Sequence, residues 1–199
     1  FISLADENYF HFSNGLWTGK KPPYQTVKVI RNTNFTRYGS IDTSDIAELE
    51  VEQKQFCTRK ILYGDIIIER SGGGPKQPVG RVVQFSSLQG DYSFSNFTSL
   101  IRSKDANKVR PRFLLYVLLD FYFNYDIQRY QAQTTGLRNL DFRKYREAVK
   151  IPLIPIALQD ESTNELDLFL SAIQKQELII NTTTELKNAL MKRLFSEGM

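Results

Sequence analysis

The chain has 199 residues, 41% hydrophobic and 24% charged, which suits one domain with an extension or two small domains. Its longest apolar runs, such as 113–119, are too short to span a bilayer, and no secretory signal is expected from its first residues. A single histidine, His11, and a single cysteine, Cys57, exclude an internal disulfide and the usual zinc sites. We therefore expect a cytoplasmic protein without membrane association or a metal site.

The formal charge of +4 is distributed unevenly along the chain. Residues 1–150 hold 22 lysines and arginines against 15 aspartates and glutamates, a net charge of +7. Residues 151–199 hold 4 and 7, a net charge of −3. A basic surface attracts nucleic acid, acidic proteins or anionic lipid, so the two parts are expected to do different things.

Strand patterns bounded by turn residues fill the first half of the chain. Residues 1–24, rich in aromatic residues, glycine and proline, are expected to be irregular, and residues 27–35 to form a strand. Tyr38 and Gly39 mark a turn, and the apolar run 66–68 is typical of a buried strand.

A glycine-rich loop is expected at 71–75, followed by strands at 79–85 and 94–101. Pro111 then suits the first turn of a helix. The buried stripe of this helix is expected to comprise Phe113, Leu114, Val117, Leu118 and Phe121.

Residues 126–141, which follow this helix, are mostly polar. Residues 126–133 predict a helix, residues 134–140 a loop, and Asp141 the cap of a short helix. Two prolines keep 151–156 extended. Strands followed by helices indicate an α+β fold, with a β-rich domain of mixed or antiparallel strands over residues 1–155.

Residues 156–199 predict a second part, one long helix, because neither glycine nor proline occurs between 157 and 197. The helix is expected to begin at a capping box over 162–165, or slightly earlier near Leu158. Apolar residues recur at spacings of three and four, or at sums of these, at Leu166, Phe169, Ile173, Ile180, Leu190 and Leu194.

A helix of this length extends about 60 Å, further than the diameter of a 150-residue domain. One domain cannot cover its apolar face, so a partner helix of the coiled-coil type is expected to do so. The alternative is that the helix breaks near 181–184 and folds back as a hairpin.

Three motifs suggest enzymes, and each is incomplete. The run 21–24 (KPPY) lacks the acceptor oxygen that an amino-methyltransferase needs at its first position, because Lys21 only donates hydrogen bonds. The run 71–76 lacks the spacing of a phosphate-binding loop. Asp65 and Glu69 share a strand face as a nuclease metal pair would, but Ser71 replaces the expected lysine. No catalytic residue is predicted.

Basic and amide side chains that can read DNA gather in three expected loops. Arginine pairs with guanine edges, asparagine with adenine edges, and lysine or arginine with phosphates. The candidate DNA-contacting residues are Arg31, Asn34, Arg37, Arg70, Lys76, Arg138 and Asn139. For Arg138 a structural role, packing the domain against the helix, stays open.

An ordered set of motifs resembles the specificity subunits of type I restriction–modification systems. Residues 64–73 (GDIIIERSGG) with 78–81 (PVGR) resemble the target recognition domain of that family, and 29–35 (VIRNTNF) its first strand. The runs 135–140 (TGLRNL) and 151–155 (IPLIP) resemble the close of that domain. A long helix follows in the family, as it does here.

The resemblance implies a subunit without catalytic activity or cofactor that recognises double-stranded DNA. Its expected partners are modification subunits, which would carry S-adenosylmethionine and methylate adenine, and in some systems a restriction subunit. Family members usually have two recognition domains and two long helices, whereas this chain has one of each and no internal repeat. The chain is therefore expected to be a half-length subunit or a fragment of a longer one, and a half-length subunit could pair with a second copy of itself.

Two interpretations from other classes remain open. The chain could be a stand-alone nuclease or methyltransferase, which would act without partner subunits. It could also be an interaction protein that binds its partners through the helix and does not bind DNA. A DNA-binding titration at several salt concentrations would distinguish this alternative.

Overall fold

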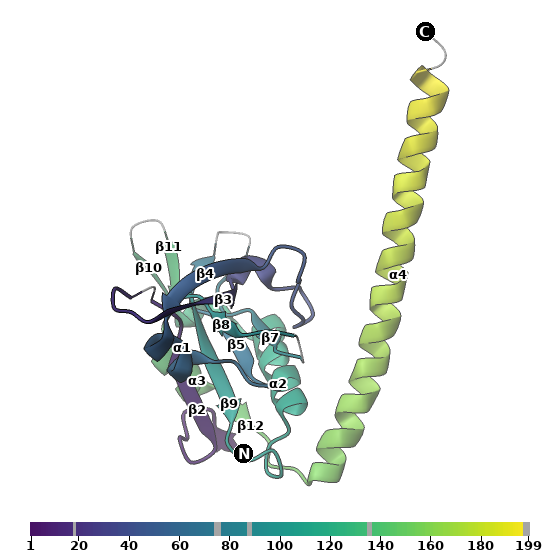
Figure 1. Cartoon of the computed structure of the whole chain (residues 1–199). Coiled ribbons are helices and arrows are strands. Elements are labelled where there is room, and N and C mark those ends of the chain that lie inside the picture. The colour runs from purple at the N-terminus through teal and green to yellow at the C-terminus, as the bar shows by residue number, and fades with distance from the viewer. Residues whose placement is uncertain (18, 74–76, 87–88, 135–136, 197–199) are drawn as a thin grey trace. The chain divides into compact units, whose positions relative to one another are not determined.

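A computed structural model describes residues 1–17, 19–73, 77–86, 89–134 and 137–196 (Figure 1). The chain divides into two compact units, Phe1–Asp160 (unit 1) and Glu161–Met199 (unit 2). The division falls shortly after the boundary expected between residues 155 and 156. Within the described residues, no helix is long and apolar enough to cross a membrane.

The central sheet of unit 1 has the order β2-β9-β5-β7, and all of its neighbours are antiparallel. Its strands are β2 (Phe10–Asn14), β5 (Ile66–Glu69), β7 (Val82–Gln84) and β9 (Thr98–Ser103). All four residues of β5 are buried, so the strand expected at the apolar run 66–68 is confirmed. Strand β5 owes its position to this continuous run, which suits a strand covered on both faces.

A second sheet makes the fold mixed, because β3 (Tyr24–Ile30) pairs antiparallel with β4 (Ala47–Glu52) and parallel with β8 (Tyr92–Phe94). A third sheet joins β10 (Gln131–Thr134), β11 (Leu137–Leu140) and β6 (Ser71–Gly73). The first strand, β1 (Ile2–Ser3), pairs with β12 (Lys150–Ile151). This arrangement confirms the α+β class with mixed and antiparallel strands.

Helix α2 (Pro111–Asn124) begins at the expected proline and packs on the central sheet. Its buried side chains are Phe113, Leu114, Leu115, Leu118, Leu119 and Phe121. They join Ile66, Ile68 and Ile101 of the sheet in the largest hydrophobic cluster. Val117, expected in the stripe, is only partly buried, because Leu115 and Leu119 shift the apolar face around the helix.

Two short helices and two 3₁₀ turns complete unit 1. They are α1 (Gln53–Arg59), α3 (Phe142–Ala148), η1 (Asn32–Asn34) and η2 (Ile127–Tyr130). The Asp141 carboxylate accepts a hydrogen bond from the Lys144 backbone N–H at 3.1 Å, so the predicted cap of α3 is confirmed. This bond holds the pKa of Asp141 below its usual value.

Several expectations for polar segments are wrong. Residues 1–24 contain β1, β2 and the start of β3, and the expected loop at 71–75 begins as strand β6. The expected helix over 126–133 is the η2 turn followed by β10, and 134–140 contains strand β11 rather than a loop. Strand pairing overrides the local pattern: β2 pairs with distant β9 and β6 with distant β11, whereas β10 forms a hairpin with β11.

Other expected strands differ in their bounds. The strand expected at 27–35 ends at Ile30, because Asn32–Asn34 form a 3₁₀ turn. The strand expected at 94–101 is divided between β8 and β9 by a turn. Strand β4 and helix α1 were not predicted, although apolar and charged residues alternate along β4 (AELEVE) with the period of a strand.

Helix α4 (Ile156–Ser196) is continuous, so the hairpin alternative at 181–184 is wrong. It begins six residues before the capping box expected at 162–165. Buried Gln159 holds its first turn in unit 1: its Oε1 accepts from the Arg110 backbone N–H, and its Nε2 donates to the carbonyls of Lys108 and Ile154, each at 2.9 Å.

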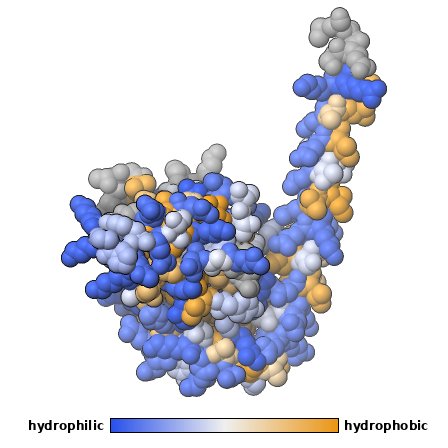
Figure 2. Space-filling model, in the orientation of Figure 1, coloured by the Kyte–Doolittle hydropathy of each residue, from blue (hydrophilic) through white to orange (hydrophobic). Residues whose placement is uncertain are grey.

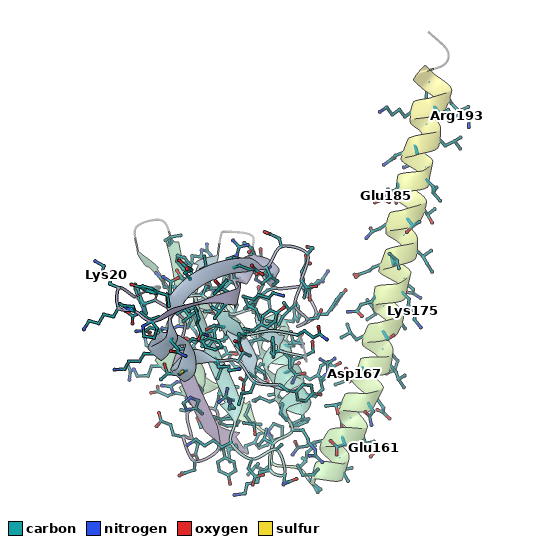
Figure 3. The ribbon with its side chains drawn as sticks, viewed as in Figure 1. Lys20, Glu161, Asp167, Lys175, Glu185 and Arg193 are labelled. Carbon is teal, nitrogen blue, oxygen red and sulfur yellow. The ribbon has the colours of Figure 1, made fainter. Side chains whose placement is uncertain are left out.

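Beyond this turn, α4 carries both charged and apolar side chains. Figure 3 shows Glu161, Asp167, Lys175, Glu185 and Arg193 projecting from the helix, and Figure 2 shows hydrophobic side chains along its surface. The residues predicted to form the apolar face are all exposed: Leu166, Phe169, Ile173, Ile180, Leu190 and Leu194. The chain alone therefore leaves this face in water.

Candidate nucleic-acid interface

All but one of the side chains predicted to contact DNA lie among the described residues; Lys76 lies outside them. Arg70 follows β5, and Arg138 and Asn139 lie on β11. Because β11 pairs with β6, the fold brings these residues close together although about 70 positions separate them in sequence.

Three neighbouring pockets, which share lining residues and are together called the groove, lie around this point. Its central section, of about 380 Å³, is lined by Asn14, Gly15, Trp17, Arg70, Ser71, Asn96, Thr98, Ser99, Asn139 and Leu140. On one side lies an aromatic section of about 370 Å³, which shares Trp17 and Asn96 with the central section. This section is lined further by Leu16, Val29, Arg31, Asn32, Leu49, Val51, Ser95 and Phe97.

On the other side lies an arginine section of about 320 Å³, which shares Asn14 and Arg70 with the central section. Its remaining lining residues are Phe12, Ser13, Phe142, Arg143 and Arg146. The three sections together present arginine and asparagine side chains, with aromatic rings between them. This is the chemistry that nucleic-acid surfaces combine: cations for phosphates, amides for base edges and rings for bases.

Arg70 is the residue around which the central section is organised. Its Nη1 donates to Ser99 Oγ at 3.1 Å and to Asn14 Oδ1 at 3.4 Å, and its guanidinium lies over the Phe142 ring at 4.8 Å. Burial lowers the pKa of Arg70, and the nearby charge of Arg146 lowers it further. The side chain is thus fixed in place before any ligand binds.

Gly15 allows the groove to form. A Cβ at this position would lie 1.8 Å from the Ser95 carbonyl oxygen, so no other residue fits without displacing the backbone. Here the end of β2 meets the turn between β8 and β9, and Leu16 bridges to Ser95. This close approach places Trp17 beside Asn96 in the groove.

Asn34 is buried, with 2% of its surface exposed, and both ends of its amide are bound within the protein. Its Oδ1 accepts from the Arg31 backbone N–H and its Nδ2 donates to the Asp45 carbonyl, each at 2.9 Å. These bonds favour a structural role for Asn34 in place of the base contact predicted from sequence. Arg31 lines the aromatic section and is ion-paired with the exposed Asp45 at 3.1 Å.

Arg37 lies in a different place. It is exposed, lies over the Tyr38 ring at 5.7 Å, and lines a separate pocket of about 290 Å³ with Arg81, Tyr122 and Phe123. The fold therefore does not bring Arg37 together with Arg70, Arg138 and Asn139.

The sequence analysis missed several groove residues. Trp17 and Phe97 are 64% and 45% exposed although they are large and apolar, and Asn14, Asn96 and Arg146 line the groove beside them. The segment before β3 was expected to be irregular, so its side chains were not considered. The available signal was Trp17, an aromatic residue three positions after Asn14.

Asp65 and Glu69, the residues with the strand spacing of a nuclease pair, each bind an arginine with both oxygens. Arg102 donates from Nε and Nη2 to the two oxygens of Asp65, both at 2.6 Å. Arg81 donates from Nε and Nη2 to the two oxygens of Glu69 at 2.9 and 3.0 Å. Both acidic residues are 1% exposed, so they serve as the buried halves of two ion pairs.

No protein-family model matches the chain. A protein of Methanocaldococcus jannaschii described as the type I restriction enzyme MjaX specificity subunit is 24% identical over 174 residues. The match covers 83% of this chain and 39% of that protein.

Two solved structures share the fold. The S subunit of a type I restriction–modification system from M. genitalium matches with a TM-score of 0.56 at 13% identity, over 99% of this chain and 46% of that one. The HsdS subunit of Thermoanaerobacter tengcongensis matches with a TM-score of 0.56 at 14% identity, over 96% and 50%. The chain thus has the fold of about half of such a subunit, and the resemblance seen in its motifs is confirmed.

Proposed function

We propose that this chain, whose relative and structural neighbours are specificity subunits of type I restriction–modification systems, is a half-length DNA-recognition subunit. The observation that carries the proposal is the fold match over nearly the whole chain, which includes both the groove-bearing unit 1 and the long helix α4. Unit 1 recognises a short duplex sequence through the groove, and α4 holds partner proteins and sets the spacing between recognition units.

The groove supplies the donors for base recognition. Arg70 and Asn139 line its central section, and Arg138 precedes Asn139 on β11. Arginine and asparagine side chains make bidentate contacts with guanine and adenine edges. Trp17 and Phe97 offer exposed rings at the adjoining section. The net charge of +7 over residues 1–150 favours approach to the duplex.

The chain itself contributes no catalysis in this proposal. Methyl transfer to adenine belongs to modification subunits that bind S-adenosylmethionine, and cleavage, where it occurs, to a restriction subunit. The assembly acts on the genome in the cytoplasm. The bidentate ion pairs at Asp65 and Glu69 support this division, since they occupy the carboxylates that a stand-alone nuclease would need.

A methylation assay tests the proposal. The chain is mixed with the adenine methyltransferase encoded beside it, and methylated sites in genomic DNA are mapped. We expect site-specific adenine methylation only when both proteins are present. Methylation or cleavage by the chain alone would support the stand-alone enzyme, and absence of DNA binding at low salt would support the interaction protein.

Base recognition makes a residue-level prediction. Arg138→Ala and Asn139→Ala should each weaken binding to the mapped target by about 1–3 kcal/mol, because Asn139 lines the groove and Arg138 is its neighbour on β11. Competition binding against a scrambled duplex measures the change. Arg37→Ala, which removes an arginine outside the groove, serves as the control and should leave target preference intact. If all three variants prefer the mapped target over the scrambled duplex to the same extent, β11 does not contact the bases.

The long helix supports a homodimer. Its exposed apolar row extends over residues 166–194, and its relatives are about twice the length of this chain. A second copy, packed antiparallel, would cover the row and supply the missing half.

Light scattering of the full chain at micromolar concentration tests this assembly. We expect about twice the 23.1 kDa of one chain. Ile180→Glu should give a monomer, because it places a charge in the apolar row. Ser171→Glu adds the same charge to the opposite face of α4 and should remain dimeric. A monomeric wild-type chain would refute self-association.

A further inference from the structure

The arginine section of the groove holds two guanidinium groups against one aromatic ring. Arg70 lies 4.8 Å and Arg146 5.2 Å from the centre of the Phe142 ring, and Arg146 also lies 4.3 Å from that of Phe12. Arg146 comes from α3 and Arg70 from the connection between β5 and β6. Packing on the rings holds both cations in fixed positions although they carry the same charge.

These cations are incompletely neutralised. The Nε atoms of Arg70 and Arg146 are buried and have no hydrogen-bond partner among the described residues. The carboxylate that approaches Arg146 is that of Glu7, at 3.9 Å and 78% exposed, so water screens it. Burial and the charge of Arg146 lower the pKa of Arg70, and the carboxylate of Asp141 only partly offsets them. Two guanidinium groups stacked on one ring repel each other. An anion between them would relieve this repulsion.

The space beside the pair fits a phosphate group. The arginine section encloses about 320 Å³ and is lined further by Ser13, Asn14 and Arg143. Arg143 is largely exposed, and its partner Glu147 lies at the loose distance of 3.7 Å. A hydroxyl, an amide and three guanidinium groups therefore face one small volume, which is the donor set that phosphate oxygens accept from.

The position of this section points to the source of the phosphate. It adjoins the central section, since Asn14 and Arg70 line both. If a base of a DNA strand contacts the central section, the phosphates of that strand lie close to the arginine section. Phosphate contacts of this kind fix the register of a protein on the duplex without reading its sequence.

We propose that Arg70, Arg143 and Arg146 form a clamp for a backbone phosphate of the bound DNA strand, and that it sets the register in which the central section meets the bases. The inference rests on the proposed DNA-recognition function and deepens it. The proposal assigns two roles. The clamp contributes binding affinity that does not depend on DNA sequence, whereas Asn139 and Arg138 contribute preference for the target sequence. Arg70 belongs to the clamp and contacts both sections.

The experiment measures binding of the full chain to a random-sequence 30-base-pair duplex and to the mapped target, each at several salt concentrations. Arg146→Gln should weaken binding to both duplexes by the same factor, roughly tenfold. It should also reduce the slope of log K against log salt concentration by about 0.9, the value for one lost phosphate contact. Arg146→Lys keeps the charge and should keep the slope.

Two controls distinguish the loss of a phosphate contact from a general loss of charge and from misfolding. Arg129→Gln removes an arginine that is 78% exposed and does not line the groove, and should leave the slope unchanged. Thermal unfolding of each variant identifies losses that come from misfolding, and Arg143→Gln, at the exposed member of the cluster, should reduce the slope without changing stability.

The outcomes are distinguishable. If the wild-type chain binds both duplexes but Arg146→Gln and Arg143→Gln keep its salt slope, the clamp is refuted and DNA recognition stands. A loss confined to the mapped target would make these arginines base contacts and would also refute the clamp. If the wild-type chain binds neither duplex at low salt, both the clamp and the proposed function fail.

Discussion

Glu69→Ala is expected to lower the free energy of unfolding of unit 1 by about 3–5 kcal/mol, the usual cost of leaving one partner of a buried ion pair uncompensated. Glu69 lies at the end of β5, and its side chain is 2% exposed. It binds the guanidinium of Arg81 through both oxygens and accepts a further hydrogen bond from the Asn32 amide at 3.1 Å.

The loss is large because Glu69 is the carboxylate that Arg81 pairs with among the described residues. The guanidinium lies over the Phe35 ring at 5.6 Å and donates to the carbonyls of Asn32 and Phe35, so it cannot swing into water without breaking these contacts. Removing Glu69 would leave a cation in a largely buried place. The η1 turn, which carries Asn32 into the groove, would lose the hydrogen bond from Asn32 to the end of β5.

Urea denaturation followed by near-ultraviolet circular dichroism measures the effect, because the aromatic signal comes mainly from unit 1. Glu69→Gln keeps the amide contact and the shape, and should cost less than Glu69→Ala. Glu48→Ala, on the exposed face of β4, should change stability by less than about 0.5 kcal/mol. A Glu69→Ala protein as stable as the Glu48→Ala protein would show that the ion pair does not support the fold.

The sequence predicts those elements whose local residue pattern already matches the place they take in the folded domain. The run 66–68 is buried on both faces, and Pro111 starts α2 where its missing N–H is harmless. The long helix follows from an apolar row without glycine or proline. In each case neighbours within a few positions determine the structure.

The groove could not be predicted in the same way. Its side chains come from β2, the connection after β5, the turn before β9, and β11, so they meet only once the sheets have formed. Strands β6, β10 and β11 are polar, and they become strands because their backbones find partners, which no local period reveals. Asn34 shows why side-chain chemistry alone does not identify a base contact. Its amide could bind a base, but it is buried and bonds to the backbone of Arg31 and Asp45 around the η1 turn.

The shape of the DNA target follows from the symmetry of the proposed dimer. Two identical copies related by a twofold axis present the same groove in opposite directions, so each reads the same bases on opposite strands. The target is therefore expected to be an interrupted palindrome, with two inverted half-sites around a spacer that is not read. With α4 near 60 Å and about 3.4 Å per base pair, the separation should be under two helical turns.

Changing the length of α4 should change the spacer and leave the half-sites intact. Seven residues inserted into its exposed part preserve the apolar repeat and add about 10 Å, which corresponds to roughly three base pairs. Mapping methylated adenines in cells that carry the wild-type and lengthened chains gives both targets directly. Ser171→Glu, which changes α4 without lengthening it, serves as the control and should leave the spacer unchanged. Because a homodimer cannot read two different sequences, a split target with unrelated halves would refute it and require a second, different recognition unit.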